Sequence, residues 1–216
     1  MDFITSILTI TIRAGTSLTI ATIGEILTER TGILNLGVEG IMLMGALTAF
    51  ATVFYSHSIM LGILAAIAIG GILALLHAFL TTTMRANQVV SGLSITLFGT
   101  GFSSFLGQRL GPESNNFRLV GLRAERILPF APNWAKDIPI LSAFLNQDIM
   151  TYFVYLFIPL AWFFLYKTRP GLWLRSVGED PYTADAMGID VTKTRYFYTI
   201  IGGMLIALGG AHLSLS

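Results

Sequence analysis

Residues 176–191 read SVGEDPYTADAMGIDV and form a long polar run between two hydrophobic stretches of the chain. The run predicts a short helix with both ends marked. Asp180 can cap the N-terminus, and Pro181 suits the first helical position because the N–H that proline lacks has no helical partner there. Gly188 can adopt the left-handed conformation that ends a helix. We therefore expect a helix over residues 181–187, about 10 Å long.

A helix this short needs stabilisation from outside the helix itself. Isolated helices of this length are marginal in water because helix nucleation is costly. A capped helix therefore indicates an element that docks on a partner, where Ala184 and Ala186 allow close approach and Met187 offers an adaptable apolar contact. The alternative is an ordinary loop that happens to be rich in good turn residues. The rest of the chain has to decide between the two.

The composition is that of a membrane protein. The 216 residues are 54% hydrophobic and 12% charged, whereas soluble domains carry about 25% charged residues. The net charge is +1. The sequence has no basic cluster of the kind that binds nucleic acid. The absence of cysteine excludes disulfides and thiolate metal sites, and the three histidines have no ligand spacing. We expect no metal or other cofactor.

A hydrophobic stretch of about 20 residues can cross the hydrocarbon core of a bilayer. The chain has six candidates, at residues 4–27, 36–55, 59–80, 88–106, 149–166 and 196–216. We therefore predict an all-α polytopic membrane protein with a single transmembrane domain over residues 1–216. Residues 107–148 form an outer loop, with a short interfacial or re-entrant helix expected near residues 134–145. Residues 167–195 form a connection that contains the capped helix.

Basic residues in short loops predict the orientation, because they gather on the cytoplasmic side. Three connections, at residues 28–35, 81–87 and 167–195, contain Arg30, Arg85, Lys167, Arg169, Arg175, Lys193 and Arg195. The opposite short segments, residues 1–3 and 56–58, contain no Lys or Arg. Residues 107–148 carry five basic residues, but the rule weakens in long loops. We predict that the N-terminus lies outside and that the capped helix faces the cytosol.

Three charged side chains fall within predicted spans, where each costs about 2.5–3.5 kcal/mol on insertion scales and needs a partner or water. Glu25 is expected near the cytoplasmic end, where it can neutralise Arg30. Arg13 is expected at mid-span, with a cross-helix partner or a watery cavity. Glu39 lies between two glycines in a closely packed or irregular segment. It is either a structural carboxylate bonded to neighbouring N–H groups or a contact for substrate.

The fourth span begins with polar residues. Asn87, Ser91 and Ser94 follow helical spacing and predict a polar stripe, with Gln88 beside it. Such a stripe either lines a pathway or makes hydrogen bonds between helices.

Glycines recur at helical spacing near the C-terminus. Gly202 and Gly209 share one helix face, as do Gly203 and Gly210, because each pair is seven residues apart. Small residues let membrane helices approach closely. We predict a tightly crossed helical bundle.

We predict that the chain is not an enzyme. The sequence has no nucleophile beside a base, no paired acidic motif and no metal cluster. It also lacks the GxxxxGK[ST] loop that binds nucleotide phosphates. If transport uses ATP, another subunit must supply the chemistry.

Four segments together resemble one transporter family. Residues 29–42, ERTGILNLGVEGIM, are similar to the ER(S/T)G-x-x-N-x-G-x-EG-x-M signature of bacterial ABC importer permeases for branched-chain amino acids, ribose and nucleosides. Residues 87–93, NQVVSGL, resemble its NE-V-(I/V)-SG segment, with Gln88 in place of the usual Glu. Residues 138–147, IPILSAFLNQ, resemble its outer-loop IP-x-L…F-x-Q pattern, and residues 169–181, RPGLWLRSVGEDP, resemble TR-x-G-L-x-L-R-A-V-GE-(N/D)-P. The resemblance runs in order along nearly the whole chain.

The resemblance implies that the capped helix is the coupling helix, which docks in a cleft of a cytoplasmic ATPase subunit. The residues expected to carry coupling are Gly178, Glu179, Asp180, Pro181, Ala184, Ala186, Met187, Gly188 and Ile189. Bulky changes at Ala184 or Gly188 are expected to uncouple ATP hydrolysis from uptake while leaving folding largely intact. The residues expected to border the translocation path are Asn35, Glu39, Asn87, Gln88 and Ser91.

The resemblance also implies an assembly in the bacterial inner membrane. Permeases of this family pair with a second permease, two ATPase subunits and an external substrate-binding protein. The pattern is nearest the nucleoside and simple-sugar branch. Family members usually continue through further spans, so we expect a C-terminal part to be missing from this chain.

Other functions stay open from the sequence. The chain is alternatively a branched-chain amino acid permease, or a secondary transporter in which Arg13, Glu25 and Glu39 relay ions. A membrane-embedded enzyme and a purely structural partner in a membrane complex are the remaining alternatives. The capped polar run favours the ATPase-coupled importer.

Overall fold

The computed structural model describes residues 2–112, 119, 127, 143–145 and 147–216. Six of its helices are long and apolar enough to cross a membrane. They are α1 (Asp2–Glu29), α2 (Val38–Ser56), α3 (Ile59–Ala78, continued by the π-helical turn η1, Phe79–Thr83), α4 (Gln88–Gly107), α6 (Ile149–Lys167) and α9 (Val191–Leu215). Two shorter helices, α7 (Arg169–Glu179) and α8 (Pro181–Ala186), join α6 to α9. No β-strand occurs in the described part of the chain, and the predicted all-α membrane fold is confirmed.

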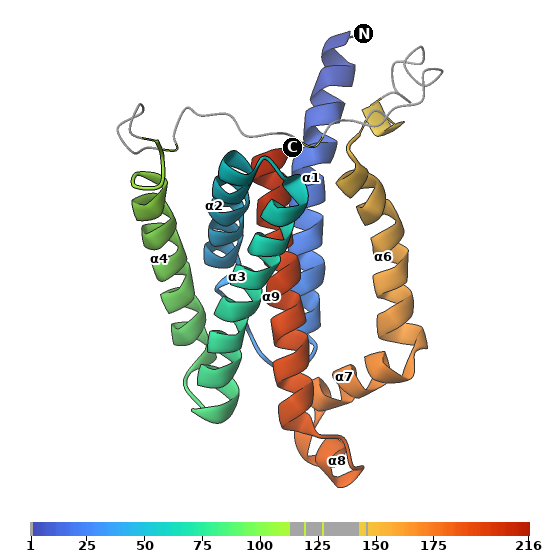
Figure 1. Ribbon diagram of the computed structural model, residues 1–216. Coiled ribbons are helices and arrows are strands. Elements are labelled where there is room, and N and C mark those ends of the chain that lie inside the picture. The colour runs from blue at the N-terminus through green and yellow to red at the C-terminus, as the bar shows by residue number, and fades with distance from the viewer. Residues whose placement is uncertain (1, 113–118, 120–126, 128–142, 146) are drawn as a thin grey trace.

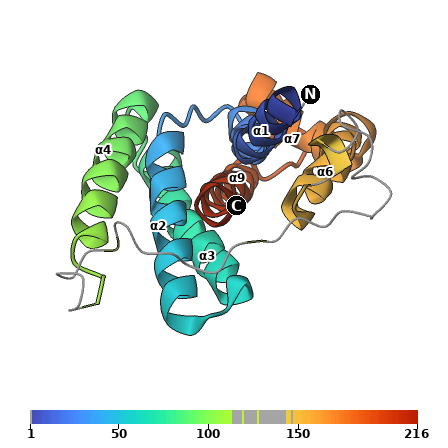
Figure 2. The same ribbon diagram turned by 90° about the horizontal axis from the view of Figure 1, so that it is seen from above.

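Helix α9 is the centre of the bundle (Figure 1). Seen from above, α1, α2 and α3 surround it, while α4 and α6 lie on two outer sides (Figure 2). We refer below to the end of the bundle where α7 and α8 lie as the α8 end. Ser216 lies at the opposite end.

Glycines allow α9 to pack this closely. A Cβ atom on Gly209 would lie 2.6 Å from the carbonyl oxygen of Ser17 in α1, and one on Gly210 would strike that of Met42 in α2. Gly202 likewise meets the backbone of Gly24 in α1. Gly202 and Gly209 therefore share the face toward α1, as their spacing predicts. Close backbone approach is how helices gain contact where lipid removes the hydrophobic driving force.

The glycines around Glu39 make a second close crossing. A Cβ on Gly99 of α4 would lie 2.6 Å from Cα of Gly40, and one on Gly40 would lie 2.7 Å from Cα of Thr96. The expected close packing of this segment is confirmed.

Side-chain caps explain where several helices begin. Asp148 accepts a hydrogen bond from the Thr151 N–H at 2.9 Å and caps α6. Asp190 accepts one from the Lys193 N–H at 2.9 Å and caps α9. Helix α9 therefore begins five residues before the predicted span at residue 196. The charged Lys193 and Arg195 belong to its first turns instead of a loop, because a helix can extend past the hydrocarbon core.

Helix α7 was not foreseen from the sequence and crosses the α8 end of the bundle (Figure 1). Thr168 caps it by accepting from the Gly171 N–H at 3.2 Å. Leu174 and Val177 are fully buried on its inner side. Most of the interfacial helix expected near residues 134–145 lies outside the described residues; the described residues 143–145 are helical.

Candidate coupling and permeation sites

Helix α8 is defined by its two ends, as the sequence predicts. Asp180 accepts hydrogen bonds from the N–H groups of Tyr182 at 3.0 Å and Thr183 at 3.2 Å. Gly188 has φ +83°, the left-handed conformation that glycine adopts readily. Its N–H donates to the Asp185 carbonyl at 2.8 Å. The structure ends the helix at Ala186, one residue before the expected end.

The cap on α8 stays charged at neutral pH. Hydrogen bonds from the Thr183 hydroxyl, then from the Thr183 and Tyr182 N–H groups, outweigh desolvation and hold the pKa of Asp180 below its usual value. A carboxylate at a helix N-terminus also interacts favourably with the helix dipole.

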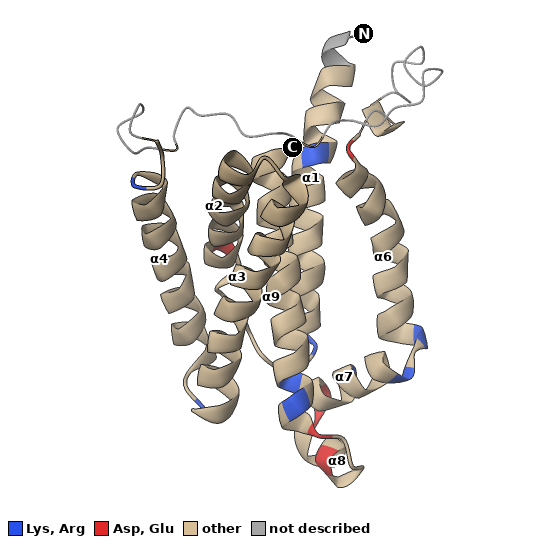
Figure 3. Cartoon of the chain, viewed as in Figure 1, with Lys and Arg blue, Asp and Glu red and all other residues tan. Residues whose placement is uncertain are grey.

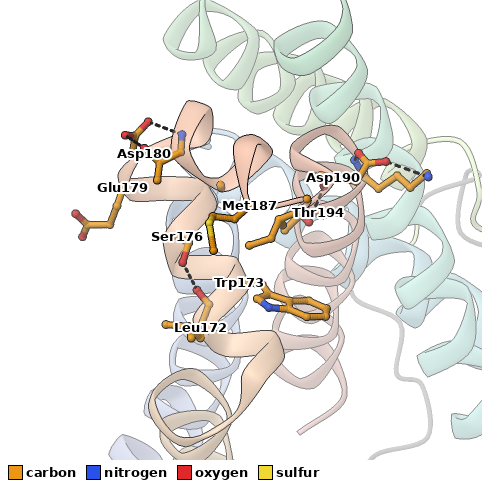
Figure 4. Close-up of a pocket in the computed structure, with 13 residues that line it drawn as sticks. Leu172, Trp173, Ser176, Glu179, Asp180, Met187, Asp190 and Thr194 are labelled. Carbon is orange, nitrogen blue, oxygen red and sulfur yellow. Dashed lines mark hydrogen bonds and ion pairs between the residues drawn. The ribbon is translucent and has the colours of Figure 1, made fainter.

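A hollow of about 690 Å³ opens between α7, α8 and the start of α9. It is lined by Leu172, Trp173, Ser176, Glu179, Asp180, Thr183, Ala184, Met187, Gly188, Ile189, Asp190, Lys193 and Thr194. Trp173 and Met187 turn toward the same space, whereas the Glu179 carboxylate points away (Figure 4). The lining therefore combines apolar side chains such as Trp173 and Met187 with charged ones, three acidic and one basic.

Large apolar side chains on α8 are exposed. Met187 is 78% exposed and Tyr182 is 88% exposed, although both follow the polar cap outside the six membrane spans. Exposed apolar groups that cluster outside a membrane mark contact surfaces. The sequence reasoning missed Tyr182, because a tyrosine inside a polar run gives no periodic pattern.

Several predicted coupling residues do not face outward. Ala184 is only 3% exposed, although it lines the hollow. That a bulky residue at this position leaves folding largely intact stays a prediction. Gly178 packs on the 30–32 turn, where a Cβ would strike the Arg30 carbonyl oxygen. The outward-facing members of the predicted set are Glu179, Asp180, Ala186, Met187 and Gly188.

Three of the predicted path residues hold the segment between α1 and α2. Gln88 accepts from the Leu34 N–H at 2.8 Å and donates to the Gly32 carbonyl at 3.3 Å. The Ser91 hydroxyl lies 2.9 Å from His77 Nδ1. Asn35 is 2% exposed and accepts from a nearby backbone N–H. In this conformation these side chains form hydrogen bonds within the protein, and their place beside a translocation path stays a prediction.

Asn87 and Ser94 complete the predicted stripe. Asn87 caps α4 by accepting from the N–H groups of Val89 and Val90. Ser94 donates to a carbonyl of its own helix. Within the described part of the chain, Ser91 is the one member of the stripe whose side chain forms a hydrogen bond to another helix.

Glu39 is different. Its side chain is exposed, and it has no hydrogen-bond or ion-pair partner among the described residues. Helix α2 begins well above the lower end of α9 (Figure 1). Gly45 packs on Ala207, with a virtual Cβ 2.7 Å from its Cα, and Glu39 lies about 9 Å further along α2. The Glu39 carboxylate therefore lies about halfway along the length of the bundle, on its exposed surface. The expected bonds to neighbouring N–H groups are not formed.

The other two charged residues also differ from expectation. Glu25 accepts from the Asn35 N–H at 3.3 Å and forms no ion pair with Arg30. Arg13 lies one turn before Ser17, whose hydroxyl is 2.7 Å from His212 near the end of α9. Arg13 therefore lies near the end of α9 that is opposite α8, and its depth in the membrane stays a prediction. Its Nε is buried without a hydrogen-bond partner in the described part of the chain.

His212, which looks isolated in the sequence, joins helices. His212 Nδ1 meets Ser17 of α1 at 2.7 Å, and its Nε2 meets Asp148 before α6 at 3.0 Å. The order Ser–His–Asp is that of a hydrolase triad. Here, however, Ser17 and His212 are 0% exposed and Asp148 is 1% exposed, so no substrate can reach the serine in this conformation. The group serves to connect α1, α6 and α9.

The comparison with protein families agrees with the arrangement of six membrane-spanning helices. Residues 6–216 match the family described as branched-chain amino acid transport system / permease component. The chain belongs to this permease family. The six apolar helices make it a multi-pass membrane protein.

Three relatives of this chain are named as ABC transporter permeases for a sugar or for nucleosides. The putative glucose ABC transporter permease protein TsgC13 of Haloferax volcanii is 41% identical over 100% of this chain and 64% of its own length. The guanosine ABC transporter permease protein NupQ of Bacillus subtilis is 35% identical over 89% of this chain and 62% of its own length. The nucleoside ABC transporter permease protein NupC of Lactococcus lactis is 35% identical over 91% of this chain and 63% of its own length.

The chain thus spans 62–64% of the length of these three relatives. No solved structure matches it significantly.

Proposed function

We propose that this chain is the membrane permease subunit of an ATP-driven importer that carries nucleosides or simple sugars. The observation that supports this most is α8, a helix capped at both ends that presents exposed Tyr182 and Met187 beside an apolar hollow. The names of three relatives favour sugars and nucleosides over branched-chain amino acids.

We also propose the partners and the orientation. A cytoplasmic ATPase subunit docks on α8 and hydrolyses the ATP, a second permease completes the membrane part, and an external binding protein delivers substrate. Most of the Lys and Arg residues that the structure describes gather at the α8 end (Figure 3), which supports a cytosolic location for that end and an external N-terminus.

The proposed stroke passes from α8 to the bundle by two routes. Along α7, Gly178 packs on the turn at Arg30. Along α9, the Arg195 Nε donates to the Thr31 carbonyl at 3.2 Å. Both routes reach the segment between α1 and α2, so a displacement of α8 shifts the start of α2.

We propose that Glu39 borders the translocation path. An unpartnered carboxylate exposed to lipid would be costly at this depth, which favours water or a second subunit beside it. Thr96 of α4 packs on Gly40, the residue after Glu39, and donates to the Leu36 carbonyl at 2.7 Å. Asn35, Asn87, Gln88 and Ser91 then support the segment that leads to Glu39.

The docking surface can be tested with Met187→Glu. A charge at this exposed position leaves the bundle intact but opposes insertion into an apolar cleft. The matched control is Met84→Glu, at a 62% exposed methionine at the end of η1. We expect M187E to lower co-purification of the ATPase by at least about tenfold, the effect of 1.4 kcal/mol, and M84E to leave it unchanged. Normal ATPase binding and ATP-driven uptake by M187E would refute the docking proposal.

A further inference from the structure

A second hollow, which we call the α1–α6 groove, has a volume of about 530 Å³. Its walls are apolar and include Ile23 and Ile26 of α1 and Ile158 and Leu165 of α6. Its volume is within the range of about 300–1,000 Å³ typical of small-molecule sites. The groove is separate from the hollow beside α8.

The groove is polar at one end only. Glu29 and Arg30 line it there, together with Trp162 and Tyr166. Glu29 and Lys167 are the last residues of their two membrane spans. Ile158 lies nine residues before Lys167, about 13 Å deeper in the membrane. The groove therefore matches an amphiphile, with a polar mouth at the membrane surface and apolar walls below it.

Unpaired cations surround the mouth. The Arg175 guanidinium lies 5.1 Å from the centre of the Tyr166 ring, and the Lys167 ammonium lies 5.8 Å from that of Trp162. Among the described residues, no carboxylate lies within ion-pair distance of Arg30, Lys167 or Arg175. The Nε of Arg175 is buried without a hydrogen-bond partner. Glu29 is the one acidic residue that lines the groove, so the mouth keeps an excess of positive charge.

We propose that the α1–α6 groove binds an acidic phospholipid. One acyl chain lies against the isoleucines, and the anionic headgroup interacts with Arg30, Lys167 and Arg175. Basic pockets between membrane helices are known to suit anionic headgroups, and Trp and Tyr favour the depth of the headgroups. This inference does not depend on the docking of an ATPase.

Quenching of Trp162 tests the proposal directly, because this tryptophan lines the groove. Trp134→Phe and Trp173→Phe leave it as the only tryptophan. The purified full chain is placed in bilayers of phosphatidylcholine that contain brominated phosphatidylglycerol or, at equal mole fraction, brominated phosphatidylcholine. We expect the apparent affinity for the brominated acidic lipid to be at least about fivefold higher, the effect of one cation near the surface. Equal quenching by both lipids, or none by either, would overturn the proposal.

Variants then separate charge from shape. Arg175→Gln with Arg30→Gln, or Lys167→Gln by itself, should reduce the preference for the acidic lipid, whereas Arg85→Gln, at an exposed arginine of the same end, should not. Ala161→Phe, which fills the groove, should weaken quenching by both lipids. The same change at exposed Ala14 should have no effect.

A free anion is distinguished from a lipid by inorganic phosphate at matched ionic strength. We expect phosphate to leave the lipid preference unchanged. Loss of the preference in phosphate, or an equal loss in R85Q, would contradict a lipid site.

Discussion

The buried His212 illustrates what single residues do in this fold. Its two ring nitrogens meet Ser17 and Asp148, which belong to segments 195 and 64 positions away in the sequence. No spacing rule connects such distant positions, so the contact could not be predicted from the sequence. The marked ends of α8 were predictable, because Asp180 and Gly188 act on their immediate neighbours.

We predict that His212→Leu destabilises the bundle by about 1–3 kcal/mol, because it leaves the buried Asp148 carboxylate without its partner. Thermal unfolding in detergent measures this. Ser17→Ala removes a neutral hydroxyl and should cost less. A stability of H212L equal to wild type would show that the contact contributes nothing.

The contact between His212 and Asp148 also makes the stability of the fold depend on pH. Burial raises the pKa of Asp148, but the hydrogen bonds from His212 and Thr151 and the charge of His212 outweigh burial, so the pKa lies below its usual value. A carboxyl group with a lowered pKa stabilises the fold above its unfolded-state pKa of about 3.9. This stability is lost as the pH falls through the folded-state pKa. We expect wild type to lose stability below about pH 4 by more than Asp148→Asn does in the same titration, and parallel curves would contradict this.

At the scale of whole helices, hydrophobic length predicted the six spans, because lipid imposes about the same length on every one. Shorter elements were harder. Helix α7 has only Gly171, Leu174 and Val177 on its buried face, too few to stand out among charged neighbours. The start of α9 was placed too late because Lys193 and Arg195 look like loop residues.

The crossing of α9 with α2 gives an element-scale prediction. Gly210→Ala puts a methyl group on the Met42 carbonyl oxygen, and backbone cannot move aside cheaply. We expect a loss of about 1–3 kcal/mol. Gly15→Ala in α1 has nothing within 4 Å of the new Cβ and should gain about 0.5–1 kcal/mol. The unfolding midpoints of the two variants measure these changes in stability. A G210A variant as stable as wild type would contradict the tight crossing of α9 and α2.

At the scale of the whole molecule, the predicted path residues divide into two roles. Glu39 is exposed and has no polar partner among the residues that the structure describes, while Gln88, and Ser91 through His77, hold the segment before α2. The sequence placed all of them near one another but could not say which side chain is free. Hydrogen-bond partners depend on how α3 and α4 pack, which no local pattern records.

We predict that Glu39→Cys reacts with a small polar thiol reagent and that the rate changes when the ATPase binds nucleotide. The chain has no cysteine of its own, so labelling reports this position alone. Ser91→Cys, at a 5% exposed position, is the control and should react far more slowly. An unreactive Glu39→Cys in every nucleotide state would remove Glu39 from the path.

The most direct test of the coupling proposal is the labelling of Met187→Cys by a membrane-impermeant thiol reagent in sealed vesicles of known orientation. We predict labelling from the cytosolic side only, and protection when the ATPase subunit is added. Labelling from the external side, or labelling that the ATPase leaves unchanged, would contradict the account.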